Sequence, residues 1–249
     1  MVVLKTGREL KVMLEACRIS AGALKAAGEA VEPGVTTAEL DMIAEKYILS
    51  QGGEPNFKNY EGYPATACIS INNEVIHGIP SKHRRLERGD IVSIDLGAKF
   101  DGYHGDNAAT FACGDVSPEA KRLMDVTREA LYKGIAAALA GGRIGDISFA
   151  VQSFVEKNGF SVVREFVGHG IGTHLHEPPE VPNFGTAGHG IRLLPGMTLA
   201  IEPMVNAGNY GVKVLPDGWT TLTKDGSLSA HFEHTVAITP DGPLIMTKV

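Results

Sequence analysis

The stretch DIVSIDLGAKFDGYHGDNAATFA, residues 90–112, predicts the centre of the fold. Two apolar runs, 91–98 and 103–112, flank a turn that has Asp101 and Gly102 near its tip, which is typical of a β-hairpin. Strand alternation places Asp95 within the first apolar run, where a carboxylate is costly unless a cation or hydrogen bonds replace its water. Asp106, on the second strand, falls within about two residues of Asp95 in cross-strand register, so the two carboxylates are expected to converge.

Helical patterns precede this hairpin and recur after it. Thr6 and Thr36 each have a Glu three residues later, a capping-box spacing, and apolar residues then follow with a helical period. Ser117, followed by Pro, begins a third helix, and a fourth ends at Asn158-Gly159. The sequence therefore predicts two helix pairs.

The two pairs have the same internal spacing. An offset of 107 residues aligns Leu40 with Ile147 and Gly52 with Gly159, and we interpret it as a duplication, although unrelated amphipathic helices could match by chance. Further strands are expected at 198–201 and 229–238. This order predicts an α+β fold in which helices pack on one face of a largely antiparallel sheet. We expect one fused catalytic domain, 1–249, with pseudo-symmetric halves of approximately 1–113 and 114–249 and the active site between them.

Bulk composition limits the functions to be considered. The 249 residues are 43% hydrophobic and carry a net charge of -6, which gives no general attraction to nucleic acid or to an anionic membrane. Cys17, Cys68 and Cys113 form no CxxC pair, so neither a disulfide framework nor a thiolate zinc site is expected. There is no export signal and no apolar run long enough to span a membrane, and we expect a cytoplasmic protein.

Two acidic residues in the second half repeat the anomaly of Asp95. Glu202 and Glu233 each lie within an apolar strand pattern, and His169 lies in the glycine-rich segment 168–172. A single carboxylate or histidine of this kind is often only a solvated or supporting polar group. Four carboxylates and one imidazole together, however, suit two divalent ions and predict a dinuclear hydrolase. In such an enzyme Glu202 could move the proton, and His77 and His176 are candidates for donors to the substrate.

These residues lie in motifs that resemble those of bacterial type I methionine aminopeptidases, whose fold is the pita-bread fold. The resemblance covers nearly the whole chain, and its segments are CISIN (68–72), VIHGIP (75–80), DIVSIDLG (90–97), Gly105-Asp106, GHGIG (168–172), HEPP (176–179), PGMTLAIEP (195–203) and EHT (233–235).

The resemblance implies a role for each matching residue. It makes Asp95, Asp106, His169, Glu202 and Glu233 the metal ligands, with Asp106 and Glu233 bridging two divalent ions that could be Co, Mn, Fe or Zn. His77 and His176 correspond to substrate-binding histidines. Tyr60, Tyr63, Cys68 and Trp219 would line the methionine pocket, unless they are plain core residues. Phe57 and Leu175 stand at positions that vary in the family and leave the pocket shape open.

The implied activity is metal-dependent removal of the initiator methionine from nascent proteins, with a small second residue preferred. The expected partner is the N-terminal Met of nascent chains, at the ribosome, and neither nucleic acid nor membrane; no pattern calls for a dimer, so a monomer is expected. One alternative is a proline-directed aminopeptidase or prolidase, whose large extra N-terminal domain this sequence lacks. The other is a non-catalytic pita-bread binding module, which would typically lose ligands.

Overall fold

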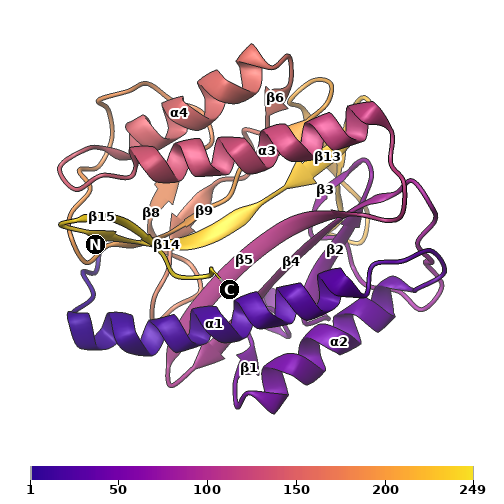
Figure 1. Cartoon of the computed structure of the whole chain (residues 1–249), viewed down its shortest axis with the longest axis horizontal. Helices are drawn as coiled ribbons and strands as arrows, with labels where there is room; N and C mark the ends of the chain where they lie inside the picture. The colour runs from indigo at the N-terminus through magenta and orange to yellow at the C-terminus, as the bar shows by residue number, and fades with distance from the viewer. Residues whose placement is uncertain (1, 249) are drawn as a thin grey trace.

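The predicted hairpin is the longest strand pair of the protein (Figure 1). In the computed structural model, which describes residues 2–248, it consists of β4 (Ile91–Phe100) and β5 (Tyr103–Ala112) in unbroken antiparallel register. Asp101 and Gly102 form the two-residue turn, with φ of 47° and 82°. Positive φ at both turn residues suits the right-handed twist of the strands, which explains why Asp-Gly stands here.

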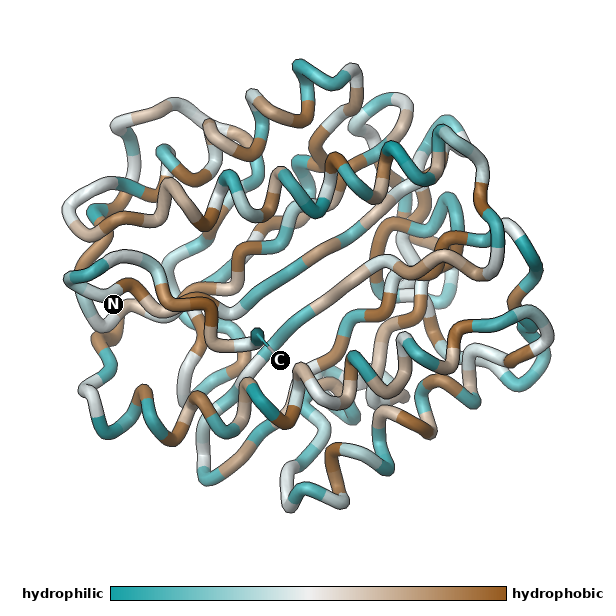
Figure 2. Tube along the Cα trace, in the orientation of Figure 1, coloured by the Kyte–Doolittle hydropathy of each residue, from teal (hydrophilic) through white to brown (hydrophobic). Residues whose placement is uncertain are grey.

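The four predicted helices are present, and the first three begin directly after their predicted caps. They are α1 (Gly7–Glu29), α2 (Thr37–Ser50), α3 (Pro118–Ala137) and α4 (Ile144–Lys157). Thr6 and Thr36 both form full capping boxes, and the Ser117 side chain accepts a hydrogen bond from the backbone N–H of Ala120. Figure 1 shows one helix pair on each side of the central strands, and Figure 2 shows hydrophobic residues recurring along both pairs.

The sheet is antiparallel throughout its described pairings. The main sheet has the order β1-β4-β5-β14-β9-β7-β8, with β2 also paired to β4 and β15 to β14. Its remaining members are β1 (Glu54–Pro55), β2 (Ala67–Ile71), β7 (Gly168–Gly170), β8 (Glu177–Val181), β9 (Thr198–Ile201), β14 (Glu233–Thr239) and β15 (Gly242–Ile245). Two three-stranded sheets contain β3 (Glu74–Ile76), β6 (Ser161–Val162), β10 (Met204–Asn206), β11 (Val212–Val214), β12 (Thr221–Thr223) and β13 (Ser229–His231). These features confirm the predicted α+β, pita-bread architecture.

Helices cover one face of the main sheet. On β4, Val92, Ile94 and Leu96 are buried in one cluster with residues of α1 and α2, such as Leu24 and Leu40. In the second half, residues of α3 and α4 share a cluster with residues of β9 and β14. The alternate residues of these strands point to the other face, which the helices leave free for a site. Within residues 2–248 no helix has the length and apolarity needed to cross a bilayer.

Local contacts repeat at the offset of 107 residues. The backbone N–H of Gly34 donates to Leu86 O, and that of Gly141 donates to Leu193 O, both at 2.8 Å. Isolated bridges likewise join Thr36 to Arg85 and Arg143 to Arg192. We therefore propose that 1–113 and 114–249 are two copies of one design within a single domain. The end residues of that range, 1 and 249, lie outside the described part.

The single strand predicted over 229–238 is wrong in one respect, because the chain breaks it at Phe232. β13 pairs with β10 in a small sheet, whereas β14 pairs with β5 and β9 in the main sheet. The segment 229–238 contains no Gly or Pro that would mark a break, so the sequence could not reveal that its two parts belong to different sheets. The break places Glu233 at the first position of β14.

Candidate metal centre

Asp95 and Asp106 point to the helix-free face of the hairpin. Asp95 alternates with the helix-facing Ile94 and Leu96. Gly105 faces α1 so closely that a Cβ there would lie 2.6 Å from the Cys17 backbone, so its neighbour Asp106 points to the opposite face. Asp95 is directly opposite Ala108, two residues along β5 from Asp106. The two carboxylates therefore occupy the diagonal position that the sequence predicted.

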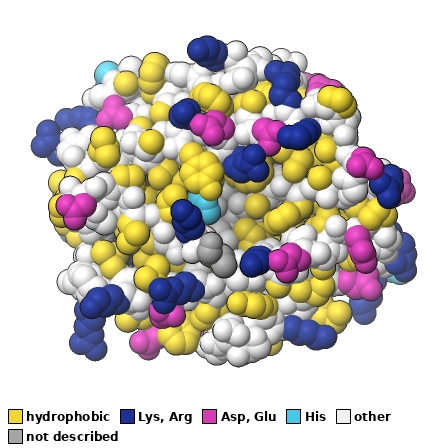
Figure 3. All heavy atoms as spheres, in the orientation of Figure 1, with side chains coloured by type: hydrophobic (Ala, Val, Ile, Leu, Met, Phe, Trp, Pro, Cys, Tyr) yellow, Lys and Arg dark blue, Asp and Glu magenta, His cyan; other side chains and the backbone are white. Residues whose placement is uncertain are grey.

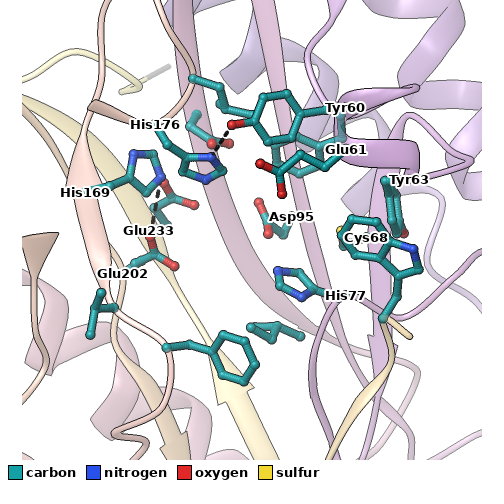
Figure 4. Close-up of a pocket in the computed structure, with 17 residues that line it drawn as sticks. Tyr60, Glu61, Tyr63, Cys68, His77, Asp95, His169, His176, Glu202 and Glu233 are labelled. Carbon is teal, nitrogen blue, oxygen red and sulfur yellow. Dashed lines mark hydrogen bonds and ion pairs between the residues drawn. The ribbon is translucent and has the colours of Figure 1, made fainter. Parts of the chain in front are cut away.

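Ala108 also joins the hairpin to the second half of the chain. It is the register partner of Asp95 on one side and of Glu233 on the other. Three adjacent strands thus present Asp95, Ala108 and Glu233 in a row on one face. The small methyl of Ala108 leaves space above it, toward which carboxylates from both sides converge, as Figure 4 shows for Asp95 and Glu233.

His169 and Glu202 complete the group from β7 and from the end of β9. The Nδ1 of His169 lies 2.9 Å from Gly170 O, so it carries the ring proton and Nε2 keeps its lone pair. That Nε2 lies 3.6 Å from the Oε1 of Glu202. Ligand atoms of Asp106, His169 and Glu233 all lie within 4.8 Å of one another. The structure thus brings together all five residues predicted from the sequence, and all five line one pocket.

The polar atoms of this cluster are arranged for a cation. The Oδ1 atoms of Asp95 and Asp106 and the Oε1 of Glu233 are buried without a hydrogen-bond partner among the described residues. Buried carboxylate oxygens without donors are strongly disfavoured unless a metal or a proton satisfies them. Carboxylate oxygens with one imidazole nitrogen are the donors that divalent ions such as Mn, Fe, Co and Zn accept. The residues therefore fit a metal centre.

Without a metal, the cluster is electrostatically unfavourable as a set of anions. Burial raises the pKa of Asp106 to about 7. Burial, and then the charges of the neighbouring carboxylates, raise the pKa values of Asp95, Glu202 and Glu233 well above their usual range. Protons or metal ions must hold these groups together at neutral pH.

His77 and His176 face the same pocket from opposite sides (Figure 4). The His176 ring lies 4.3 Å from that of His169, centroid to centroid, and its Nδ1 lies 2.8 Å from the Tyr60 hydroxyl. His77 has a φ of 59°, an uncommon value for a residue with a side chain. Burial, followed by the nearby His176, lowers the pKa of His77 to about 4, so its ring is neutral at pH 7.

Aromatic side chains form another part of the same pocket. Tyr63 and Cys68 are buried together in a small cluster against which Phe57 and Trp219 pack. The rings of Tyr63 and Trp219 meet edge to face at 5.1 Å, and Cys68 is the register partner of Asp95. All six residues considered for the methionine pocket line it: Phe57, Tyr60, Tyr63, Cys68, Leu175 and Trp219.

Comparison with known proteins agrees with this geometry. The model of metallopeptidase family M24 matches residues 11–240. The chain belongs to metallopeptidase family M24. The methionine aminopeptidase of Clostridium perfringens is 53% identical to this M24 peptidase over 249 residues, 100% of both chains. Methionine aminopeptidase 1 of Bacillus subtilis is 52% identical, again over 100% of both. These relatives confirm the resemblance drawn from the motifs.

Solved structures separate two branches of the family. The methionine aminopeptidase of Thermotoga maritima has a TM-score of 0.99 and 44% identity, with 100% of both chains covered. The prolidase of Pyrococcus furiosus has a TM-score of 0.79 and 26% identity, and the match covers 99% of this M24 peptidase but 66% of the prolidase. The proline-directed alternative is therefore the less supported of the two.

His231 of this M24 peptidase has no role predicted from the sequence. It is 1% exposed, and both of its ring nitrogens lack a hydrogen-bond partner within residues 2–248. Its Nε2 lies 3.7 Å from the Oε2 of Glu202, opposite the side that faces His169. Glu202 thus lies between two imidazoles. The only sequence signal was the spacing of His231 two residues before Glu233, which is too common to decide a role.

A buried ion pair supports the loop that carries His176. The Nζ of Lys5 lies 2.5 Å from the Oε2 of Glu177, and both side chains are almost fully buried. The other oxygen of Glu177 accepts the backbone N–H of His174. The segment before α1 is thereby fixed to the start of β8. A lysine near the start of a chain gives no sequence signal for such a long-range contact.

The raised carboxyl pKa values of this M24 peptidase predict that the stability of the metal-stripped protein depends on pH. In chelator, the free energy of unfolding is expected to fall as pH rises from about 4 past 7, because the unfolded chain releases these protons first. A loss of a few kcal/mol would lower the melting temperature by about 5 to 10 °C. Calorimetry at pH 5, 6, 7 and 8, with EDTA and with Mn, measures it. Equal stability at pH 5 and 8 in EDTA would contradict the expectation, whereas Mn should remove most of the decline.

Proposed function

We propose that the protein is a dinuclear metal-dependent methionine aminopeptidase that removes the initiator methionine from newly made proteins and prefers a small second residue. The observation that carries the proposal is the convergence of Asp106, His169 and Glu233 ligand atoms within 4.8 Å, beside an aromatic pocket lined by Cys68 and Trp219. Full-length similarity to methionine aminopeptidases supports the same substrate.

Five residues are proposed to hold two divalent ions. Asp95, Asp106, His169, Glu202 and Glu233 would supply the donors, and the family resemblance suggests that Asp106 and Glu233, whose ligand atoms lie within 4.8 Å of each other, would be shared between the two ions. When bound, two such ions lower the pKa of a water and polarise the substrate carbonyl. The identity of the metal, among Co, Mn, Fe and Zn, depends on supply as much as on this donor set.

Glu202 is proposed to move the proton of the reaction. Its carboxylate lines the pocket, with one oxygen 3.6 Å from the Nε2 of His169 and the other 3.7 Å from the Nε2 of His231. As the water oxygen adds to the carbonyl carbon, Glu202 accepts the water proton. It then delivers that proton to the amide nitrogen as the C–N bond breaks, which releases methionine and a new N-terminal amine.

The two histidines are proposed to bind the scissile amide. When the Tyr60 hydroxyl donates its hydrogen bond to Nδ1 of His176, the ring proton is on Nε2, which can donate to the carbonyl oxygen as it gains charge. His77 approaches from the other side of the pocket, between the rings of Phe166 and Trp219. The methionine side chain would lie against Tyr63, Cys68 and Trp219, where a thioether contacts aromatic rings favourably.

Peptide assays test the activity directly. The metal-stripped protein, with and without added Mn or Co, is incubated with Met-Ala-Ser, Met-Leu-Ser and Ala-Pro-Ser. We expect metal-dependent release of methionine from Met-Ala-Ser and little from Met-Leu-Ser. Cleavage of Ala-Pro-Ser would move the assignment to the proline-directed branch. No cleavage by protein that holds two metals would support a binding module instead.

The cellular location, oligomeric state and partners are proposed from the same resemblance to methionine aminopeptidases. We propose that the protein acts in the cytoplasm as a monomer on nascent chains at the ribosome, with no nucleic-acid or membrane partner. The net charge of -6 supports the last point, because it offers no general attraction to polyanions. Analytical ultracentrifugation tests the monomer, and co-sedimentation with ribosomes at low and high salt tests the association.

A further inference from the structure

Glu61 is a pocket residue that the proposed metal centre does not use. It lies in a 3-10 turn, η1 (Tyr60–Gly62), at the mouth of the pocket. Its φ is 50°, and Asn59 and Gly62 on either side also have positive φ. A glutamate pays a conformational cost for this backbone, so the turn must be held by its surroundings.

Two aromatic anchors hold the turn. Tyr60 contacts His176 through its hydroxyl, and the buried Tyr63 packs on Trp219 while its hydroxyl lies within 3.1 Å of Ala67 O and Gly78 O. The backbone N–H of Asn59 also donates to Tyr63 O at 2.8 Å. With both ends fixed, the direction of the Cα–Cβ bond of Glu61 is fixed too. Figure 4 shows its carboxylate turned into the pocket, between Tyr60 and Asp95.

The Glu61 carboxylate shares the pocket with His176, whose ring lies 5.2 Å from that of the neighbouring Tyr60, centroid to centroid. The side chain of Glu61 is exposed, so it remains accessible to a ligand at the mouth.

Glu61 sets the net charge of the mouth once metal is bound. The pocket is lined by five carboxylates: Glu61, Asp95, Asp106, Glu202 and Glu233. Among the described lining residues there is no Lys or Arg. Two divalent ions would balance the charge of the four buried carboxylates, and Glu61 would remain as the uncompensated negative charge. Glu61 alone among these five carboxylates is in an exposed residue, so it lies where the pocket opens to solvent.

We propose that Glu61 is a specificity-determining residue that favours substrates with Lys or Arg directly after the second residue. The inference rests on the proposed aminopeptidase function. A small second residue cannot reach the rim, whereas an extended peptide advances about 3.3 Å per residue, so a long cationic side chain at the third position can. The attraction between the Glu61 carboxylate and this cationic side chain is modest, because both are exposed to solvent. It affects substrate association and binding more than the chemical step.

The test compares peptides that differ only at position three. We expect the metal-loaded protein to release methionine from Met-Ala-Lys-Ser with a kcat/KM about tenfold above that for Met-Ala-Glu-Ser at low salt, with Met-Ala-Gln-Ser between them. Glu61→Gln should bring the Lys to Glu ratio close to one, and Glu61→Lys should invert it. About 0.5 M NaCl should flatten the wild-type ratio, because it screens exposed charges.

Controls separate the possible failures. Glu29→Gln removes the same charge from an exposed position on α1, outside the pocket, and should keep the wild-type ratio. Failure to cleave Met-Ala-Gln-Ser would overturn the proposed function itself. Cleavage of all three peptides at equal rates by the wild type, or an unchanged ratio in both Glu61 variants, would leave that function intact and overturn the role of Glu61.

Discussion

Asp106→Asn is expected to abolish methionine release, with a loss in kcat/KM of about 10³-fold or more, because a metal centre supplies several kcal/mol of transition-state stabilisation. Asp106 belongs to the group of ligand atoms within 4.8 Å, and its Oδ1 is buried without a donor. An amide keeps the shape of the side chain but loses the charge and one acceptor oxygen. It therefore cannot bridge two cations.

Metal content and stability show whether this loss arises at the metal centre. Inductively coupled plasma analysis should find fewer than two ions per chain in Asp106→Asn. The stripped variant should melt above the stripped wild type at pH 8, because one buried anion has been removed. The matched control is Asp115→Asn, whose side chain is 96% exposed. A variant that bound two ions and cleaved at the wild-type rate would refute the ligand role.

His176→Ala is expected to lower kcat by about 10²- to 10³-fold and to change KM little, as the loss of one donor to a developing oxyanion does in other enzymes. Tyr60 orients the ring through Nδ1 at 2.8 Å, which leaves Nε2 for the substrate. Tyr60→Phe should therefore reduce kcat less than His176→Ala, because the ring remains but loses its orienting partner.

His174 provides the control on the same loop. Its side chain is 81% exposed, two residues from His176, and His174→Ala should retain wild-type kcat. Both variants should keep two metal ions, measured as for Asp106→Asn. Loss of metal in His176→Ala would show that the residue supports the metal centre instead of the substrate. Equal losses in both histidine variants would indicate that the loop, and not the imidazole, matters.

Much of the fold follows from local sequence rules. The capping boxes at Thr6 and Thr36 begin the helices where expected, and Asp101-Gly102 forms the expected two-residue turn. Such signals are reliable because they depend on hydrogen bonds and φ angles within a few residues. The offset of Asp95 and Asp106 could be counted for the same reason, since a short hairpin fixes its register.

The prediction of one strand over 229–238 was wrong because distant pairing partners, and not the local sequence, decide where the strand breaks. The residues on both sides of Phe232, His231 and Glu233, are buried, and no Gly or Pro in 229–238 marks a break, so the sequence looks continuous. The break arises because β10 pairs with the first part and β5 with the second. Which partner a strand finds is decided by segments many residues away.

By itself, the sequence determined which residues are anomalous: acids in apolar strands and a histidine among glycines, together with the motifs that name their family. Only the tertiary structure decided which other residues lie next to them and support the site. Lys5 reaches Glu177, His231 approaches Glu202, and the strained turn aims Glu61 into the pocket. The physical reason is that a buried charge reveals itself by its cost wherever it stands in the chain, whereas its partners come from strands and loops that only the completed sheet brings together.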